Sequence, residues 1–241
     1  MPRFYCDTPL AAGLTIALPD AVAHHLHVLR LLPGAELRLF NGDGAEYVAQ
    51  LDSVEKRRAS ASIKAQVARD VELPFEITLV QALPEASKMD WIIEKAVELG
   101  VAAIQPLTTQ RCVVRLAGER AEKKLAHWRG VIVAASEQSG RNRLARIAPM
   151  EDFHAWTGQQ SMHKRILLTP RAEKTVSVWA RHQPPQALSL MIGPEGGFTL
   201  QEEDAAIASG ALALSMGPRI LRTETAGMAV VAALAALWGG L

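Results

Sequence analysis

The sequence predicts an α/β protein, in which a small β-rich domain precedes a larger domain with a mostly parallel sheet covered by helices on both faces. Two observations support this. In residues 1–72, short segments of alternating apolar and polar residues are separated by tight turns. In residues 75–241, apolar strands alternate with amphipathic helices. Residues 70–74, which contain two acids and a proline, are expected to link the domains.

The elements of the first domain follow from local patterns. A short helix is expected in residues 20–30, with Asp20 as its N-terminal cap. Asn-Gly-Asp-Gly at residues 41–44 predicts a hairpin turn, because Asn and Gly tolerate positive φ. Strands are expected in residues 36–40, 46–51 and 59–67. Several short strands with tight turns favour a small barrel.

The second domain begins with an apolar strand and then alternates regularly. Its first helix, residues 88–100, has its charged side chains on one side and apolar residues elsewhere, and Gly100 ends it. Strands are expected at residues 77–83, 103–107, 165–170, 188–192 and 211–214. Further helices are expected at residues 119–138 and 200–209, and from residue 223 onward. This alternation predicts a parallel sheet.

The last helix has an unusual composition. Every residue from 226 to 238 is apolar or glycine, and a helix that is apolar all round is normally buried all round. It is too short to cross a membrane. We expect it to pack on its own sheet and on a second subunit, so that the protein is a homodimer. Complete burial within one domain is the alternative.

Composition bears on the cellular compartment and on whether a metal is bound. The formal net charge of +1 neither favours nor excludes a nucleic-acid partner. No signal peptide or membrane span is expected, and Cys6 and Cys112 lie far apart without metal-ligand spacing. His24 and His27 share a helix face, but no Cys, Asp or Glu cluster joins them, so no metal site is expected. We therefore expect a soluble cytoplasmic protein.

Residues 188–199 carry the main functional signal. An apolar strand ends at two glycine-containing breaks, and Thr199 with Glu202 then forms the capping box that opens a helix. Ligands bind at this end of a strand in open α/β sheets. Glu195, in the middle of the loop, argues against a phosphate ligand, since like charges repel. A ligand with hydroxyls, an amine or a cationic centre fits better. The alternative is an ordinary strand-to-helix turn with Glu195 in solvent.

Two other loops follow predicted strands, at residues 168–171 and 215–225. Glu224 lies at the start of the last helix, where the helix dipole alone favours a carboxylate. Arg222 lies there too, where an arginine is mildly unfavourable, which favours a functional role. Basic residues near residues 111–115 and 141–143 suit phosphate binding or an ordinary solvated surface. No Gly-x-Ser-x-Gly or His-Glu-x-x-His motif indicates nucleophilic or zinc catalysis.

Four segments together resemble the RsmE family of bacterial 16S ribosomal RNA methyltransferases. They are IGPEGGF at 192–198, GPRILRTETA at 217–226, MDWIIEKAVELG at 89–100 and EQSGRNR at 137–143. Members of that family belong to the SPOUT class and methylate uridine at N3. The resemblance covers almost the whole chain. It implies that the N-terminal domain is a PUA-like β-barrel that binds RNA. It also implies that the C-terminal domain is a SPOUT-type parallel sheet with a deep trefoil knot in residues 160–241, which forms the homodimer.

The resemblance also implies S-adenosylmethionine as the methyl donor and 16S rRNA, within the small ribosomal subunit, as the partner. The residues expected to hold the donor lie in the three loops: Leu168, Thr169, Pro170, Ile192, Gly193, Pro194, Glu195, Gly196, Gly197, Met216, Gly217, Ile220, Leu221, Arg222, Thr223 and Ala226. The residues expected to contact RNA are Arg111, Arg115, Arg141, Asn142 and Arg143.

A mechanism follows as a hypothesis. The N3 proton of uracil is only weakly acidic, so the enzyme must remove it or stabilise charge on O2 and O4. Arg222 is assigned to these oxygens or to a neighbouring phosphate, and Glu195 or Glu224 to the proton. Two other functions stay open: a SPOUT enzyme that methylates another RNA atom such as the ribose 2′-oxygen, and a non-catalytic RNA-binding or ribosome-assembly protein.

Overall fold

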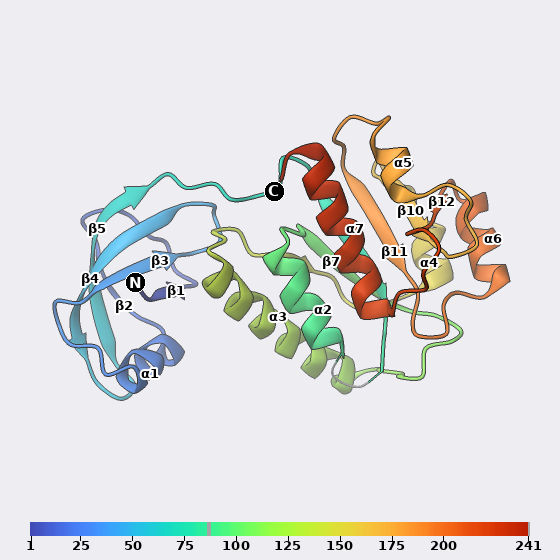
Figure 1. The fold of residues 1–241 in the computed structure, drawn as a ribbon. Coiled ribbons are helices and arrows are strands. Elements are labelled where there is room, and N and C mark those ends of the chain that lie inside the picture. The colour runs from blue at the N-terminus through green and yellow to red at the C-terminus, as the bar shows by residue number, and fades with distance from the viewer. Residues whose placement is uncertain (86–87, 241) are drawn as a thin grey trace. The chain divides into compact units, whose positions relative to one another are not determined.

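The computed structural model describes residues 1–85 and 88–240 and divides the chain into two compact units (Figure 1). The first unit consists of Met1–Glu72 and Ser136–Leu144, and the second of Leu73–Ala135 and Ala145–Leu241. The first unit therefore contains the whole of the expected domain 1–72, together with a segment from much later in the chain.

A five-stranded sheet and one helix form the first unit. Its elements are β1 (Arg3–Tyr5), β2 (Thr15–Ala17), α1 (Asp20–Val28), β3 (Glu36–Phe40), β4 (Glu46–Val54) and β5 (Ala59–Val67). The sheet order is β1-β3-β4-β5-β2, with β1 and β3 parallel and the other pairs antiparallel. The hairpin turn is confirmed, since Gly42 and Gly44 have positive φ. The capping role of Asp20 is wrong, because Pro19 is the N-cap and makes no side-chain hydrogen bond.

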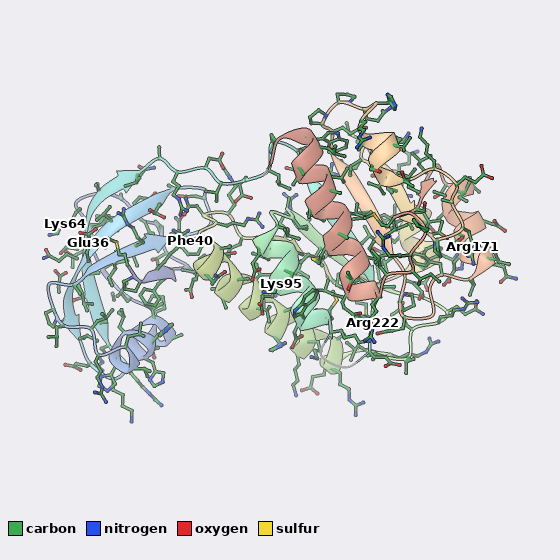
Figure 2. The ribbon with its side chains drawn as sticks, viewed as in Figure 1. Glu36, Phe40, Lys64, Lys95, Arg171 and Arg222 are labelled. Carbon is green, nitrogen blue, oxygen red and sulfur yellow. The ribbon has the colours of Figure 1, made fainter. Side chains whose placement is uncertain are left out.

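The core of this unit forms between the helix and the sheet. Along β3, Leu37 and Leu39 are buried while Glu36 is exposed, and Lys64 is likewise exposed on β5 (Figure 2). Leu26 of α1 is fully buried, and α1 packs against β4 and β5. The alternation in the sequence thus places apolar side chains under the helix.

Ser136–Leu144 completes the first unit through charged and polar contacts. The guanidinium of Arg141 forms an ion pair with Glu72, and the amide of Asn142 donates to the carbonyl oxygen of Arg69 at 2.8 Å. Arg3 pairs with Glu46 and donates to the carbonyl oxygen of Arg141 at 2.8 Å. Arg141 is only 3% exposed and Asn142 only 2%. Buried charges need such partners, so this segment is a structural part of the unit.

The second unit contains a parallel sheet, as predicted. Its strands are β6 (Ile77–Ala82), β7 (Ala103–Thr108), β8 (Arg146–Ile147), β9 (Glu151–Asp152), β10 (Lys164–Leu168), β11 (Leu188–Ile192) and β12 (Leu212–Leu214). Its helices are α2 (Lys88–Glu98), α3 (Glu119–Ser139, which ends in the first unit), α4 (Phe153–Thr157), α5 (Val176–Ala180), α6 (Leu200–Ala208) and α7 (Thr223–Trp238). The strand order is β12-β10-β11-β6-β7-β8, β9 also pairs with β7, and each of these pairs is parallel.

The apolar helix α7 packs against α2, α5 and β11, and Figure 1 shows α7 beside α2. Its inner face is buried, including Val230, Val231 and Leu234. On its other side Leu237 is 38% exposed and Ala236 is exposed. Packing on its own sheet is therefore confirmed, and complete burial within one domain is excluded. Among the described residues, no helix combines the length and the apolar character needed to cross a membrane.

Candidate functional site

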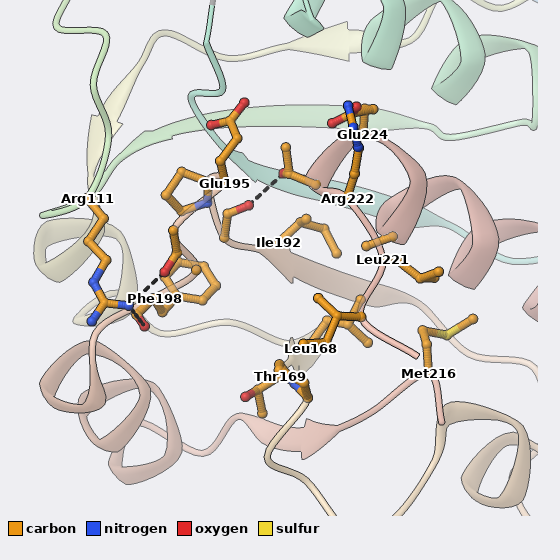
Figure 3. A pocket seen from close by; sticks show the side chains of 18 of the residues that line it. Arg111, Leu168, Thr169, Ile192, Glu195, Phe198, Met216, Leu221, Arg222 and Glu224 are labelled. Atoms are coloured by element: carbon orange, nitrogen blue, oxygen red, sulfur yellow. Dashed lines mark hydrogen bonds between the residues drawn. The ribbon is translucent and has the colours of Figure 1, made fainter. Parts of the chain in front are cut away.

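A pocket of about 520 Å³ lies at the carboxyl ends of three adjacent parallel strands, β10, β11 and β12 (Figure 3). The loops that follow these strands form its walls. Every residue expected to hold the methyl donor lines this pocket, and so does Glu224. Six further residues that the sequence did not single out for the donor also line it: Lys88, Arg111, Arg171, Phe198, Glu203 and Arg219.

The loop after β11 is a tight turn that exposes its backbone. The N–H of Gly197 donates to the carbonyl oxygen of Pro194 at 2.8 Å, and Gly197 has a φ of 67°. A Cβ atom on Gly193 would lie 2.9 Å from the backbone nitrogen of Phe198, which is too close for any real side chain. Glycine at position 193 therefore lets the two ends of the loop meet and leaves the backbone open to a ligand.

The predicted capping box at the start of α6 is confirmed. The hydroxyl of Thr199 accepts from the N–H of Glu202, and the Glu202 carboxylate accepts from the N–H of Thr199 at 2.8 Å. The other oxygen of the buried Glu202 carboxylate accepts from the backbone N–H of Gln110, also at 2.8 Å. The capping box thus connects this loop to the segment after β7, which gives the loop a fixed position.

Thr223 connects three elements at the base of the pocket. Its hydroxyl donates to the carbonyl oxygen of Gly193 at 2.6 Å and accepts from the side-chain amide of Gln81 at 3.0 Å. Thr223 opens α7, Gly193 follows β11, and Gln81 lies on β6. The start of the last helix is therefore held against the glycine loop by buried hydrogen bonds.

Glu195 is engaged by its neighbours. Its Oε1 accepts from the ammonium of Lys88 at 2.7 Å and from the backbone N–H of Glu85 at 3.0 Å. Partial burial alone raises the pKa of Glu195, but the bonds from Lys88 and Glu85 outweigh it and lower that pKa. Glu195 is thus exposed, as the alternative expected, but its carboxylate is held by two donors. Lys88 was missed from sequence, although a lysine opening a helix is the same unfavourable arrangement that singled out Arg222.

Arg222 and Glu224 lie together at the start of α7, as Figure 3 shows. Arg222 is the N-cap residue and is exposed, and its guanidinium makes no hydrogen bond or ion pair with the described part of the chain. The Oε2 atom of Glu224 is buried and has no hydrogen-bond partner among the described residues. A buried carboxylate oxygen without a donor is costly, which is typical of a site that expects a bound group.

Arg111 and Arg171 hold the opposite wall. Arg111 donates to the carbonyl oxygens of Gly196 at 2.7 Å and Phe198 at 3.3 Å, so part of its donor capacity supports the glycine loop. Arg171 donates to the buried carboxylate of Glu203 at 3.0 Å, which connects the loop after β10 to α6. Both arginines therefore help to position the pocket walls.

The five residues expected to contact RNA are not gathered at one place. Arg111 lines the pocket, whereas Arg115 is exposed and lies outside the pocket lining. Arg141 and Asn142 are buried in the first unit, and a phosphate would have to displace their present partners. We therefore assign these two a structural role in place of the expected RNA contact. Arg143, which packs beside Gly44, is exposed. For Arg115 and Arg143 the RNA contact stays a prediction.

Within residues 1–85 and 88–240, no group of three or more His, Cys, Asp or Glu side chains is arranged to hold a metal ion.

Two family models match the chain. A model described as an RNA methyltransferase domain matches residues 71–235, and one described as an RNA methyltransferase PUA domain matches residues 18–64. The fold and the pocket therefore define an RNA methyltransferase with an N-terminal PUA domain.

Comparison with similar proteins identifies the family within the RNA methyltransferases. The ribosomal RNA small subunit methyltransferase E of Bacillus subtilis is 31% identical over 91% of this chain and 89% of its own length. A crystal structure of the methyltransferase E of Neisseria gonorrhoeae, bound to S-adenosylmethionine, is 41% identical with a TM-score of 0.91, covering 99% of this chain and 98% of that one. A methyltransferase structure from Legionella pneumophila, also with S-adenosylmethionine, is 35% identical with a TM-score of 0.92, covering 97% and 96%. The chain belongs to the ribosomal RNA small subunit methyltransferase E family, as its motifs predicted.

Proposed function

We propose that this enzyme transfers the methyl group of S-adenosylmethionine to N3 of a uridine in 16S ribosomal RNA. The observation that carries this proposal is the pocket built by three loops at the ends of β10, β11 and β12, in a family whose Neisseria gonorrhoeae member binds S-adenosylmethionine. The choice of uridine N3 rests on the resemblance of the four sequence motifs to the family.

The pocket residues fit this donor. A volume of about 520 Å³ lies within the usual range for small-molecule sites, about 300–1,000 Å³. The side chains of Leu168, Ile192 and Leu221 provide apolar walls, and the backbone around Gly193 is open to close approach. The donor carries a sulfonium and an amine, and the carboxylates at the pocket suit a cationic ligand. When bound, S-adenosylmethionine supplies an electrophilic methyl group.

The residues of the chain then have to bind the uracil base, accept its N3 proton and position N3 for the methyl group. N3 lies on the Watson–Crick edge of uracil, so the uridine must be unpaired or turned out of a helix to reach the pocket. The free guanidinium of Arg222 would bind a uracil oxygen or a neighbouring phosphate. A pocket carboxylate would accept the N3 proton. Holding N3 in line with the methyl group would supply much of the rate.

The proposed partner is the small ribosomal subunit, which would place this reaction in the cytoplasm. The PUA domain and the exposed Arg115 and Arg143 would contact the RNA backbone. We further propose that the exposed side of α7 binds the same face of a second copy, because an apolar helix face of this length is normally covered. The knot in residues 160–241 stays a prediction of the family resemblance.

The test is labelled methyl transfer from S-adenosylmethionine to small ribosomal subunits from a strain that lacks this protein. We expect one methyl group per subunit, and mass spectrometry of the digested RNA should place it on uracil N3. Subunits from a strain that retains the protein are the control and should accept none. A methyl group on a ribose oxygen would show that the reaction class is wrong. If calorimetry detected no binding of S-adenosylmethionine, the pocket assignment would be contradicted.

A further inference from the structure

We propose that Lys88, Glu224 and Arg222 form a donor–acceptor–donor array that recognises the Watson–Crick edge of uracil. Within this array Glu224, and not Glu195, accepts the N3 proton. The proposal rests on the proposed function, since it concerns the acceptor base of the same pocket. It adds Lys88 to the site and chooses between the two carboxylates that the sequence left open.

Glu195 is the poorer proton acceptor because two donors already stabilise its charged form at one oxygen. One of its oxygens accepts from both Lys88 and the backbone of Glu85, and these contacts connect the glycine loop to the segment before α2. A carboxylate stabilised in its charged form by two donors holds protons weakly. We assign Glu195 the role of positioning Lys88.

The hydrogen-bonding environment of Glu224 is the opposite of that of Glu195. It lies in the first turn of α7, and its Oε2 has no donor within the described part of the chain although it is buried. The hydroxyl of Thr223, its immediate neighbour, is directed to the carbonyl oxygen of Gly193 and does not serve it. The Oε2 atom of Glu224 can therefore accept from a bound molecule, and an N–H of a base is such a donor.

Lys88 provides a cation in the same pocket as this carboxylate. Its ammonium has three N–H groups, and the hydrogen bond to Glu195 at 2.7 Å uses one of them. Its pKa is raised chiefly by that hydrogen bond and further by the charges of Glu195, Glu224 and Glu85, so Lys88 is protonated near neutral pH. Lys88 and Glu224 both line the pocket.

Arg222 provides a second set of donors. It precedes Glu224 by two residues, and both side chains extend from the start of α7 into the region shown in Figure 3. Its guanidinium has five N–H donors and no partner among the described residues, so it is free to bind a ligand oxygen. Among its charged side chains the pocket thus includes the cations Lys88 and Arg222 and the carboxylate of Glu224, whose buried oxygen has no donor among the described residues.

This combination complements uracil and not cytosine. Along its Watson–Crick edge uracil presents an acceptor at O4, a donor at N3–H and an acceptor at O2. Cytosine presents a donor, an acceptor and an acceptor, so its amino group would face a cation and its N3 lone pair would face a carboxylate. Leaving such groups unpaired in a closed site gives strong discrimination, about 10⁴-fold in the best-built sites.

The same array assists the reaction. As the N3–H bond breaks, the proton moves to Glu224 and the bonding electrons stay on N3. The N3 electron pair then forms the bond to the methyl carbon while the carbon–sulfur bond breaks, which leaves a neutral thioether. Negative charge spreads onto O2 and O4 as the proton leaves, and Lys88 and Arg222 stabilise it there.

The test uses the full-length enzyme with small ribosomal subunits that lack the methyl group. Glu224→Gln should lower kcat by about 100-fold or more with little change in KM. Glu195→Gln keeps an acceptor for Lys88 and should lose clearly less. Lys88→Met should lower kcat by about 10- to 100-fold, and Lys88→Arg should restore most of it. The control is Lys95→Met on the same helix, labelled in Figure 2, where Lys95 pairs with Glu94 and Glu98; it should change neither constant.

Two further readouts separate this role from a merely structural one. Calorimetry should give similar S-adenosylmethionine affinity for the Glu224→Gln variant and the wild type. The activity of Lys88→Met should also rise more steeply with pH than that of the wild type, because solvent then removes a proton that the pocket no longer acidifies. A structural defect would lower the rate equally at every pH.

The outcomes distinguish the array from the proposed function. If the wild type methylates uracil N3 but Glu224→Gln and Lys88→Met keep full kcat, the array is wrong and the function stands. If Glu195→Gln loses more than Glu224→Gln, the proton acceptor is misassigned. If the wild type methylates a different RNA atom, the proposed function fails before the array is tested.

Discussion

At the scale of single residues, Gly193 sets the shape of the pocket. Gly193→Ala would place a methyl group 2.9 Å from the backbone nitrogen of Phe198, so the glycine loop must move. We expect S-adenosylmethionine to bind about tenfold more weakly or worse, a loss of about 1.4 kcal/mol, as measured by calorimetry. The matched control is Gly130→Ala, at an exposed position of α3 with nothing within 4 Å. It should leave binding unchanged and stabilise the helix by about 0.5–1 kcal/mol. Equal binding by both variants would contradict the role of the loop.

Arg222 is the second residue that the structure singles out. Arg222→Ala should lower kcat/KM for methyl transfer to unmethylated small subunits by about 100-fold, since the guanidinium proposed to stabilise developing charge is lost. Arg181→Ala is the comparison, because Arg181 is exposed at the end of α5 and lies outside the pocket lining. Donor binding should persist in both variants. Full methylation by a folded Arg222→Ala enzyme would remove this residue from the site.

The sequence allowed some of these residues to be predicted and not others. Glu195 and Arg222 stood out because a charge occupied a place where local structure does not favour it. Lys88 carried the same signal, but its partner Glu195 is far away in sequence and only the fold brings them together. Arg141 and Asn142 were expected at a surface. Sequence could not reveal that they return to the first unit and pair with Glu72 and Arg69 there.

At the scale of elements, the contact between α2 and α3 has a pH dependence. The carboxylate of Asp90 accepts from the Trp128 indole at 3.0 Å and pairs with His127 at 2.8 Å. Burial alone raises the pKa of Asp90, but the hydrogen bond from His127, the charge of Lys124 and the bond from Trp128 together lower it. A lowered pKa in the folded state stabilises the protein when the pH is above the ordinary pKa of an aspartate. This stabilisation is lost as the pH falls through the lowered pKa.

We therefore expect Asp90→Asn to reduce the free energy of unfolding at neutral pH, with a difference from wild type that shrinks in acid. Urea unfolding at several pH values measures this. Asp204→Asn, at an exposed position of α6, should show no such pH-dependent difference. A difference for Asp90→Asn that grows towards low pH would mean that the sign of the coupling is wrong.

The elements themselves were predictable in proportion to their length. Elements with a recognisable pattern, such as the apolar run of β11, the helical period of α2 and the long apolar segment of α7, were expected close to their observed positions. β8 and β9 have two residues each, and α4 and α5 have five, which is too few for a period to be recognised. These short elements owe their structure to pairing with β7 and to packing, as in the contact of α4 with α6.

At the scale of the whole molecule, the exposed side of α7 predicts assembly. Leu237→Glu places a charge on that side and should convert the proposed dimer into a monomer in light scattering, because burying an unpaired carboxylate is costly. Ile207→Glu on α6, a comparably exposed apolar position, should leave the dimer intact. A wild-type protein that stays monomeric at all concentrations would contradict the proposed interface.

The composition of the first unit has a consequence for how this protein is made. Met1–Glu72 leaves the ribosome early, but Ser136–Leu144 follows only after Leu73–Ala135 has been synthesised. Until then Glu72 lacks the guanidinium of Arg141, and the backbone of Tyr5 lacks the carboxylate of Glu137. A nascent chain therefore carries its N-terminal portion unfinished through much of translation, and a gene fragment that stops at codon 72 encodes a domain without its closing segment.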